Sequence, residues 1–486
     1  MKDLQLDKKL EGNDGTTKPV TIQALLDEMI HSPVQSIQTL TQQYQSTTFD
    51  QFPITCKDTY INRFKMSERV LGNVSVFDMI HTSSGSSGSP TFWGRTRMDE
   101  QYVETRFQQI LHDNLNVQCT RTLAIIAFPL GSWVGGIFTT FCLRDLKALG
   151  YQLTIVTCGN QPDDIIKTIT NLSDMFEQTC IFGYPPFVKS VIDKGLLNGI
   201  QWSRYNLAFV FAGEVFSEEW RLLIGTRAGI QNPLQRIISI YGTADAGVIA
   251  QETLLSSSIR SFIASNPQLV KILFGKNRIP SLMQYDPTIR YLELHPTDHT
   301  IVLTTLPVIQ PSQSIKETVA HMTSPLIRYN IGDDGGIMDF KPFLNLLISH
   351  GFQPPQTKYR ELPFVWVFGR SFWTVSLYGA NVYVENIMVG LEHPKVCDMI
   401  TGKFVLQLTT DPDDLRLHLH IELIPNQKPS IELTNLIGEC VVEALKRLNS
   451  EFCHYIPEDK QIPLIELYTF GDSVYFPIGV KHKYII

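Results

Sequence analysis

The sequence of 486 residues has no excess of positive charge and no recognisable export signal. Its 41 Lys and Arg residues against 48 Asp and Glu residues give a formal net charge of −7. That balance leaves no basic stripe to follow a phosphate backbone, so we expect no nucleic-acid binding. The amino-terminal segment lacks an apolar stretch with a small-residue cleavage site, and the eight cysteines contain no CxxC pair. We therefore expect a cytoplasmic protein with reduced thiols.

Charge is absent altogether between Arg121 and Arg144. The segment 122–143 is long enough to span a bilayer. However, it contains one proline and three glycines, which would break a spanning helix in its middle. We instead expect a buried strand at 123–128, a tight turn, and a helix that begins near Gly135. The sequence thus predicts no membrane insertion.

The remaining composition is typical of a large folded core, since 43% of the residues are hydrophobic and only 18% are charged. From about residue 120, apolar strands alternate with amphipathic helices, a pattern typical of a parallel sheet covered on both faces. The expected strands are 153–157, 179–183, 206–213 and 236–242, and the expected helices are 162–176, 185–197 and 217–229. Later segments alternate in hydrophobicity, with strands expected at 288–295, 299–306, 326–332, 403–410 and 415–424 and a helix at 430–452.

These elements predict an α/β fold with two domains. The first, at 1–369, is a large multi-layered N-terminal domain with parallel sheets. The second, at 370–486, is a smaller α+β C-terminal domain, large enough to fold as its own unit.

A segment rich in serine and glycine, 81–96, is the first motif that suggests chemistry. Its hydroxyls and its glycines would let backbone N–H groups curve around a phosphate group. The residues concerned are Ser83, Ser84, Gly85, Ser86, Ser87 and Gly88. The alternative is a flexible linker. The GxxxxGK[ST] phosphate-binding loop occurs nowhere in the chain.

Two further motifs follow predicted strands, where ligands bind in parallel sheets. In the segment 238–247, Tyr241 can stack on a flat ring and Asp245 can hold Mg²⁺; the alternative is a turn whose Asp caps the next helix. In the segment 326–336, Asp333 or Asp334 can bind both hydroxyls of a ribose, and the alternative is an Asp-Gly hairpin turn.

Two further observations argue against a second metal site or a hydrolase. His418 and His420 are spaced to share one face of a strand, but no Cys or acidic partner is evident in the sequence, so we expect a strand face and no metal site. The chain also contains no GxSxG motif of a serine hydrolase.

The order and spacing of these motifs resemble the adenylate-forming superfamily, most closely the phenylacetate–coenzyme A ligase and coenzyme F390 synthetase branch. The resemblance extends from about residue 50 to the end of the sequence. The segments that carry it are 52–60, 83–91, 148–169, 182–193, 212–221, 241–245, 328–333 and 369–387.

The resemblance implies an enzyme that activates a small carboxylic acid, aromatic in this branch, with ATP and Mg²⁺ and then transfers the acyl group to coenzyme A. The loop at 83–88 would hold the β- and γ-phosphates. The other implied nucleotide contacts are Gly213 and Glu214, Tyr241 and Gly242 beside the adenine, Thr243 at the α-phosphate, Asp333 at the ribose and Arg370 at the hinge. Asp245 would carry Mg²⁺. The acid pocket would include 128–136, Tyr184 and 212–214.

The carboxyl-terminal segment carries the lysine that the resemblance requires for catalysis. Lys481 fits a Gly-x-Lys pattern, and Lys483 is the second candidate. The alternative for both is a solvated basic terminus. Related ligases bind structural zinc through cysteines after the strand-end motif, but 246–290 contains no cysteine, so we predict no such site.

The chain also departs from the family pattern. Ser89 stands where a lysine is usual, Asp245 where a glutamate is usual, and Phe372 and Trp373 where the hinge is usually acidic. Two alternatives to transfer to coenzyme A therefore stay open. One is transfer to an amine or a carrier-protein thiol, and the other is a degenerate member that binds nucleotide or acyl ligand without turnover.

Overall fold

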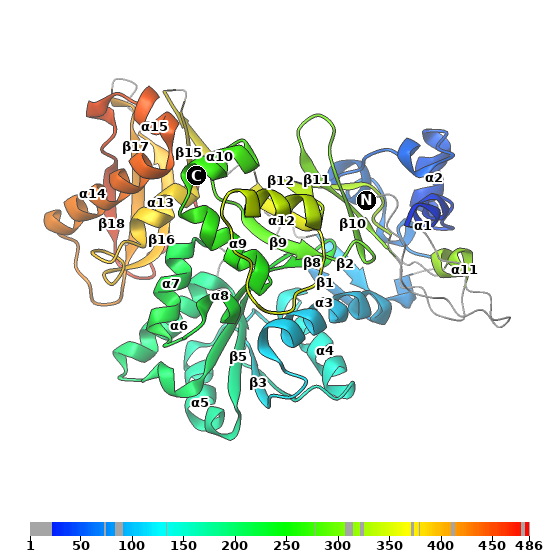
Figure 1. The fold of residues 1–486 in the computed structure, drawn as a ribbon, viewed down its shortest axis with the longest axis horizontal. Coiled ribbons are helices and arrows are strands. Elements are labelled where there is room, and N and C mark those ends of the chain that lie inside the picture. Colours follow the sequence, from blue (N-terminus) through cyan, green and yellow to red (C-terminus); the bar gives the residue numbers. More distant parts are fainter. Residues whose placement is uncertain are drawn as a thin grey trace.

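The computed structural model describes residues 22–71, 74–82, 91–132, 134–276, 278–306, 314–320, 325–370, 374–378, 380–409, 414–477 and 482–485. Within these residues, a large part is built on an 11-stranded sheet and a smaller part on a 3-stranded sheet (Figure 1). The predicted α/β fold, with a large N-terminal region and a smaller α+β C-terminal region, is confirmed. The exact boundary at 369/370 stays a prediction.

One half of the large sheet is parallel, as predicted. In order across the sheet, its strands are β4 (Leu153–Thr157), β3 (Thr122–Ile126), β5 (Gln178–Gly183), β6 (Leu207–Phe211) and β7 (Ile237–Thr243). The helices on its two faces are α3 (Arg97–Leu115) and α4 (Val134–Ala148) on one side, and α5 (Pro162–Leu172), α6 (Pro185–Leu197) and α7 (Glu218–Arg227) on the other. Ala124 and Ile126 pack with the first layer, whereas Leu123 and Ile125 pack with the second. The strand is apolar throughout because both of its faces are covered.

The pairing register aligns small side chains with one another across this half of the sheet. The row facing α3 and α4 consists of Ala124, Cys180 and Ala208. The row directly behind it, facing α5 to α7, consists of Ile125, Ile181 and Phe209. At this level of the three strands, the two faces therefore differ in side-chain volume, whereas the next row facing α3 and α4 is large, with Ile126, Phe182 and Val210.

The uncharged segment forms the predicted strand, turn and helix. Its strand is β3, and its helix α4 begins at Val134, one residue before the predicted start. Among the described residues, no helix combines the length and the apolar character needed to cross a bilayer.

The other half of the large sheet is antiparallel and mixes strands that are far apart in sequence. In order from β7, its strands are β8 (Gly247–Gln251), β9 (Ser281–Tyr285), β13 (Phe364–Arg370), β12 (Tyr329–Met338), β11 (Thr300–Thr305) and β10 (Arg290–Leu294). The helices α1 (Ile22–Met29) and α2 (Gln35–Gln43) pack on one face. The helices α9 (Leu254–Ala264), α10 (Pro267–Phe274) and α12 (Phe340–Ser349) pack on the other. The helices α8 (Pro233–Arg236) and α11 (Ile315–Ala320) are short.

The predicted alternative of an Asp-Gly hairpin turn at 333–336 is wrong, because these residues lie inside β12. The strand contains a register shift after Asp334. A Cβ atom at Gly336 would overlap the indole of Trp366 on the neighbouring strand. Glycine is present there to admit the tryptophan, not to turn the chain.

The smaller part is an α+β module beside α6 and α7, at one end of the molecule (Figure 1, orange to red). Its sheet contains β16 (Ile400–Leu408), β17 (Leu417–Leu423) and β18 (Leu464–Tyr468). Its other elements are the hairpin of β14 (Thr374–Leu377) and β15 (Ala380–Tyr383) and the helices α13 (Val384–Leu391), α14 (Ile431–Leu448) and α15 (Ser450–Tyr455). The single helix predicted at 430–452 is in fact two, because Asn449 ends α14 and caps α15 by accepting a hydrogen bond from Phe452 N at 3.1 Å.

Candidate functional site

The carboxyl ends of β6 and β7 lie side by side and carry two of the predicted motifs. Gly213 and Glu214 follow β6, and the Tyr241, Gly242 and Thr243 motif ends β7. Gly213 has φ of 92°, a conformation that other residues rarely adopt. Its backbone also passes close to the ring of Tyr184, because a Cβ atom there would lie 3.3 Å from that ring. The structure thus brings these predicted residues to one edge of the sheet.

Tyr241 and Asp333 form a buried pair that links β7 to β12. The Tyr241 hydroxyl donates a hydrogen bond to Asp333 Oδ2 at 2.7 Å, and both residues are less than 10% exposed. The two residues were predicted to stack on adenine and to bind ribose, respectively. Their direct contact indicates that the tyrosine hydroxyl orients the carboxylate, a role that the sequence did not suggest.

Thr243 and Asp245 shape the turn after β7. Thr243 Oγ1 accepts a hydrogen bond from Ala246 N at 3.1 Å, and Asp245 Oδ2 accepts one from the Tyr329 hydroxyl at 2.7 Å. The predicted alternative, an aspartate that caps a following helix, does not apply, because the turn leads into strand β8.

Asp245 is the residue at this turn that was predicted to bind Mg²⁺. Asp245 is half-buried, and one of its carboxylate oxygens accepts from Tyr329. Magnesium ions keep several waters and are commonly held by one or two carboxylates together with substrate phosphates. Asp245 therefore fits a Mg²⁺ site only in combination with the phosphates of a bound nucleotide.

The hinge-side residues lie next to Asp333. In the register of β12 and β13, Asp333 is opposite Arg370 and Asp334 is opposite Gly369. The second carboxylate of the motif, Asp334, pairs with Lys276, whose Nζ lies 4.6 Å from the centre of the Phe368 ring. Asp334 is thus engaged in an ion pair, which leaves Asp333 as the candidate for the ribose.

The six predicted residues of the serine–glycine loop, 83–88, and Lys481 lie outside the described residues. The strands on either side of the loop, β1 (Met79–Thr82) and β2 (Phe92–Arg95), pair as an antiparallel hairpin. Thr82 N donates to Ser132 O at 2.8 Å. Thr82, the last described residue before the loop, therefore lies beside the turn that follows β3, which was predicted to line the acid pocket.

Two residues of this hairpin were missed by the sequence reasoning. Arg95 is 6% exposed, and its guanidinium donates to the carbonyl oxygens of Ala244 and Asp245, the latter at 2.7 Å. His81 is fully buried, edge-on to Phe138, and neither of its ring nitrogens has a partner among the described residues. Burial, together with the charge of Arg95, lowers the pKa of His81. A basic residue shortly after the loop was visible in the sequence, but its target was not.

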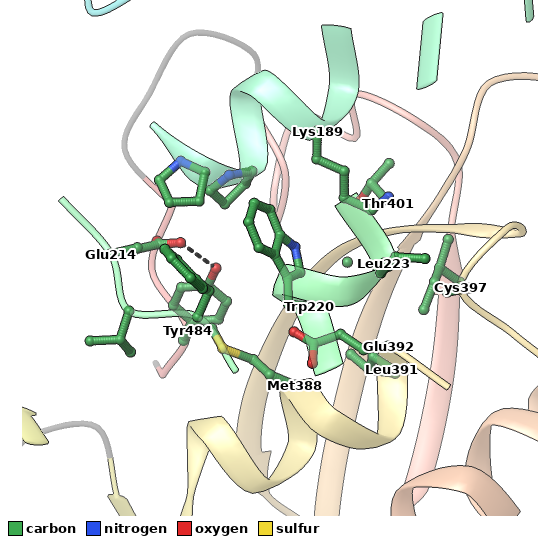
Figure 2. Close-up of a pocket in the computed structure, with 16 residues that line it drawn as sticks. Lys189, Glu214, Trp220, Leu223, Met388, Leu391, Glu392, Cys397, Thr401 and Tyr484 are labelled. Atoms are coloured by element: carbon green, nitrogen blue, oxygen red, sulfur yellow. Dashed lines mark hydrogen bonds between the residues drawn. The ribbon is translucent and has the colours of Figure 1, made fainter. Parts of the chain in front are cut away.

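Glu214 is held between the two parts of the molecule. It is 8% exposed, and it accepts a hydrogen bond from Tyr184 on the large part. It also accepts one from Tyr484 on the smaller part at 3.0 Å (Figure 2). Burial and the adjacent carboxylate raise the pKa of both tyrosines well above their usual range, so both hydroxyls stay protonated and donate.

Tyr484 belongs to the carboxyl-terminal segment that carries the candidate lysines. Leu406 N on β16 donates to Tyr484 O at 2.7 Å, and His482 contacts Phe404 O at 2.7 Å. Lys483, between them, is exposed.

A pocket with a cavity volume of about 40 Å³ lies at the contact between the two parts (Figure 2). Its walls include Glu214 and Trp220 from the large part and Met388, Glu392 and Tyr484 from the smaller part. A cavity of this size holds water molecules but no organic acid. The predicted acid pocket comprises 128–136, Tyr184 and 212–214. Of its described residues, only Glu214 lines this cavity.

Glu392, at the end of α13, contacts the start of α7 across the same pocket. Its carboxylate accepts a hydrogen bond from Ser217 Oγ, which itself caps α7 by accepting from Trp220 N at 2.9 Å. Burial raises the pKa of Glu392 to about 8; the nearby Glu219 adds to this rise, and the hydrogen bond from Ser217 opposes it. Glu392 is therefore protonated at neutral pH in this arrangement.

Comparison with known proteins gives structural matches only. No family model and no curated protein sequence matches the chain. The structure of 2-hydroxyisobutyryl-CoA ligase in the postadenylation state, in complex with R3-HIB-AMP, is similar at a TM-score of 0.64 and 14% identity, over 96% of this chain and 89% of that chain. The GH3.15 acyl acid amido synthetase in complex with 2,4-DB is similar at a TM-score of 0.53 and 12% identity, over 93% of this chain and 86% of that chain.

The same CoA ligase in an open conformation, with 2-HIB-AMP and CoA, gives a TM-score of 0.52. At these identities the likeness concerns the fold, and the fold is the one that the resemblance to the adenylate-forming superfamily predicts: the chain has the fold of the adenylate-forming ligases.

Proposed function

We propose that the chain activates a small carboxylic acid with ATP, forms an acyl-adenylate and passes the acyl group to an acceptor. In the first step a carboxylate oxygen bonds to the α-phosphorus of ATP, and the bond from that phosphorus to pyrophosphate breaks. In the second step the acceptor attacks the acyl carbon and AMP leaves. The observation that carries the proposal is the buried Tyr241–Asp333 pair at the carboxyl end of β7, within this fold.

The residues of this edge have distinct parts in the proposed first step. Asp333, oriented by Tyr241, accepts hydrogen bonds from the ribose hydroxyls. Gly242 lets the adenine lie against the strand end, since this residue is exposed and has no side chain. Thr243 offers its hydroxyl near the α-phosphate. Arg370, which lies opposite Asp333 in the pairing of β12 with β13, is the hinge residue that faces the nucleotide.

Positive charge is needed where the phosphates carry negative charge in the transition state. In this proposal the loop at 83–88 supplies backbone and hydroxyl donors, and Lys481 is the catalytic cation. Arg95 is a positioning residue, because its guanidinium holds the carbonyl oxygens of the 244–245 turn. Mg²⁺, when bound by Asp245 together with the phosphates, supplies further charge neutralisation.

Coenzyme A is the acceptor that we favour, on the sequence resemblance to the phenylacetate–coenzyme A ligase branch. An amine is the second candidate, because the amido synthetase aligns with 93% of this chain at a TM-score about equal to that of the CoA ligase in its open conformation. An aromatic acid is the substrate class that the same branch suggests.

The test is ATP–pyrophosphate exchange with a panel of aromatic and aliphatic carboxylic acids. We expect exchange that depends on one class of acid. Coenzyme A and amino acids are then added in parallel, and the release of AMP identifies the acceptor. Absence of exchange with every acid, with ATP binding intact, would contradict the proposal and would favour a non-catalytic nucleotide-binding protein.

A further inference from the structure

Two histidines and a glutamate meet on the sheet of the smaller part. His418 and His420 lie on one face of β17, and Glu466 lies directly opposite His420 on the parallel neighbour β18. The sequence prediction that the histidines form a strand face is therefore correct. The inference that they lack an acidic partner is wrong, because Glu466 follows 48 positions after His418 and comes next to it only through strand pairing.

The three side chains are close enough to bind one ion. His418 Nε2 lies 3.0 Å from Glu466 Oε1, and His420 Nδ1 lies 3.7 Å from Glu466 Oε2. One ligand atom from each residue lies within 4.8 Å of the others. Neighbouring ligands around tetrahedral Zn²⁺ are about 3.3 Å apart for bonds of about 2.0–2.2 Å. The two distances from the histidines to the carboxylate lie on either side of that value, and the three ligand atoms would have to draw together from within 4.8 Å to hold a zinc ion.

A glutamine on β16 contacts both rings from the opposite side. Gln407 Nε2 lies 3.3 Å from His418 Nδ1 and 2.7 Å from His420 Nε2. With the amide donating to both, each ring carries its proton on the other nitrogen and donates toward Glu466 and the Tyr468 hydroxyl, which lies 3.0 Å from His420 Nδ1. The cluster is then fully hydrogen-bonded without a metal.

A half-turn of the Gln407 carboxamide reverses this pattern. The amide oxygen then occupies the position of the nitrogen and accepts an N–H from each ring. Both imidazoles change tautomer, and the lone pair of His418 Nε2 then faces Glu466 Oε1. The lone pair of His420 Nδ1 faces the Tyr468 hydroxyl, which also donates to Glu466 Oε2 at 2.6 Å and would have to move aside for an ion. Such an acceptor behind each imidazole is the usual support of metal-binding histidines. One glutamine thus supports either a metal-free or a metal-ready cluster.

We propose that His418, His420 and Glu466 bind one Zn²⁺, with Gln407 as the positioning residue behind both imidazoles. Two imidazoles and one carboxylate are a donor set that suits zinc, and water completes the coordination. His420 is 2% exposed and stacks on Tyr475 with ring centres 4.1 Å apart, so its ring is fixed in place. Glu466 is exposed, which leaves the ion a path from solvent. The ion would fasten β18 to β17.

The first experiment titrates Zn²⁺ by calorimetry into the full chain after chelator treatment. We expect one ion per chain and a higher melting temperature with zinc. His418→Gln and Glu466→Gln should each weaken binding by at least about 10-fold. The control is His350→Gln, an exposed histidine at the end of α12, which should bind zinc like the parent chain. Zinc-free melting curves show that each variant is folded.

The second experiment tests the role of Gln407. Gln407→Glu places a permanent acceptor behind both rings, so we expect zinc binding about 10-fold tighter. Gln407→Leu removes the acceptor and should weaken binding by a similar factor. Visible bands of bound Co²⁺ should show a tetrahedral site in the parent chain and in Gln407→Glu. No stoichiometric zinc in the parent chain, undiminished binding in Glu466→Gln, or no gain in Gln407→Glu would each overturn the proposal.

Discussion

The protonated state of Glu392 makes the stability of this protein depend on pH in a way that a single substitution removes. The carboxyl group is half-buried at the contact between the two parts, where its pKa is about 8 rather than the ordinary 4.5. In the unfolded chain the same group ionises at its ordinary pKa. Glu392→Gln keeps the shape and the hydrogen bond from Ser217 but cannot ionise.

The sign and size of the effect follow from these two pKa values. Below about pH 4.5 the group is protonated in both states and has no effect on the difference between the two proteins. Between 4.5 and about 8 only the unfolded chain ionises, so the parent protein loses stability relative to Glu392→Gln as the pH rises. The full shift corresponds to ~5 kcal/mol. Contact of the half-buried side chain with water screens part of it, so we expect a measured change of ~2 kcal/mol.

The assay is urea denaturation of the two proteins at pH 5, 7 and 9. The advantage of Glu392→Gln should grow from pH 5 to pH 8 and then stay constant. Glu458→Gln is the control, since this carboxylate is exposed on the turn at 458–460, and such surface groups contribute little to stability. An equal difference between parent and Glu392→Gln at pH 5 and pH 9 would refute the reasoning.

Three further predictions concern the proposed adenylation. Lys481→Ala should lower ATP–pyrophosphate exchange by at least about 100-fold, whereas the exposed Lys483→Ala should keep most of it; an equal loss in both variants would contradict the assignment. Asp245→Asn should raise the Mg²⁺ concentration for half-maximal exchange by about 10-fold, and an unchanged magnesium dependence would exclude Asp245 as a ligand. Tyr241→Phe keeps the ring but removes the hydrogen bond to Asp333, which is worth ~2 kcal/mol when the acceptor is charged. It should therefore raise the KM for ATP by about 30-fold and leave the KM for the acid unchanged; equal changes in both would point to a general loss of structure.

The parallel half of the large sheet could be predicted from the sequence because its signals are local. Strand β4 begins and ends where the run at 153–157 indicates, and α6 spans 185–197 as expected. A continuous apolar run needs cover on both faces, and a flanking amphipathic helix supplies it. No distant residue has to be known for either inference.

The antiparallel half and the site contacts could not be predicted, because they depend on pairing between distant segments. Strand β13 lies between β12 and β9, an order that no local pattern shows. The contact of Tyr484 with Glu214 joins residues 270 positions apart. The contact of Tyr241 with Asp333 joins residues 92 positions apart. The motifs indicated candidate residues, but not which of them would contact one another.

The row of small side chains at Ala124, Cys180 and Ala208 has a consequence for how the parallel strands find their alignment. Both faces of these strands are apolar, so a slip of one residue would cost little hydrophobic burial. It would, however, exchange the small row for Ile125, Ile181 and Phe209, and force large side chains against α3 and α4. Volume, rather than polarity, therefore selects the native alignment of these strands, and it excludes misaligned sheets during folding.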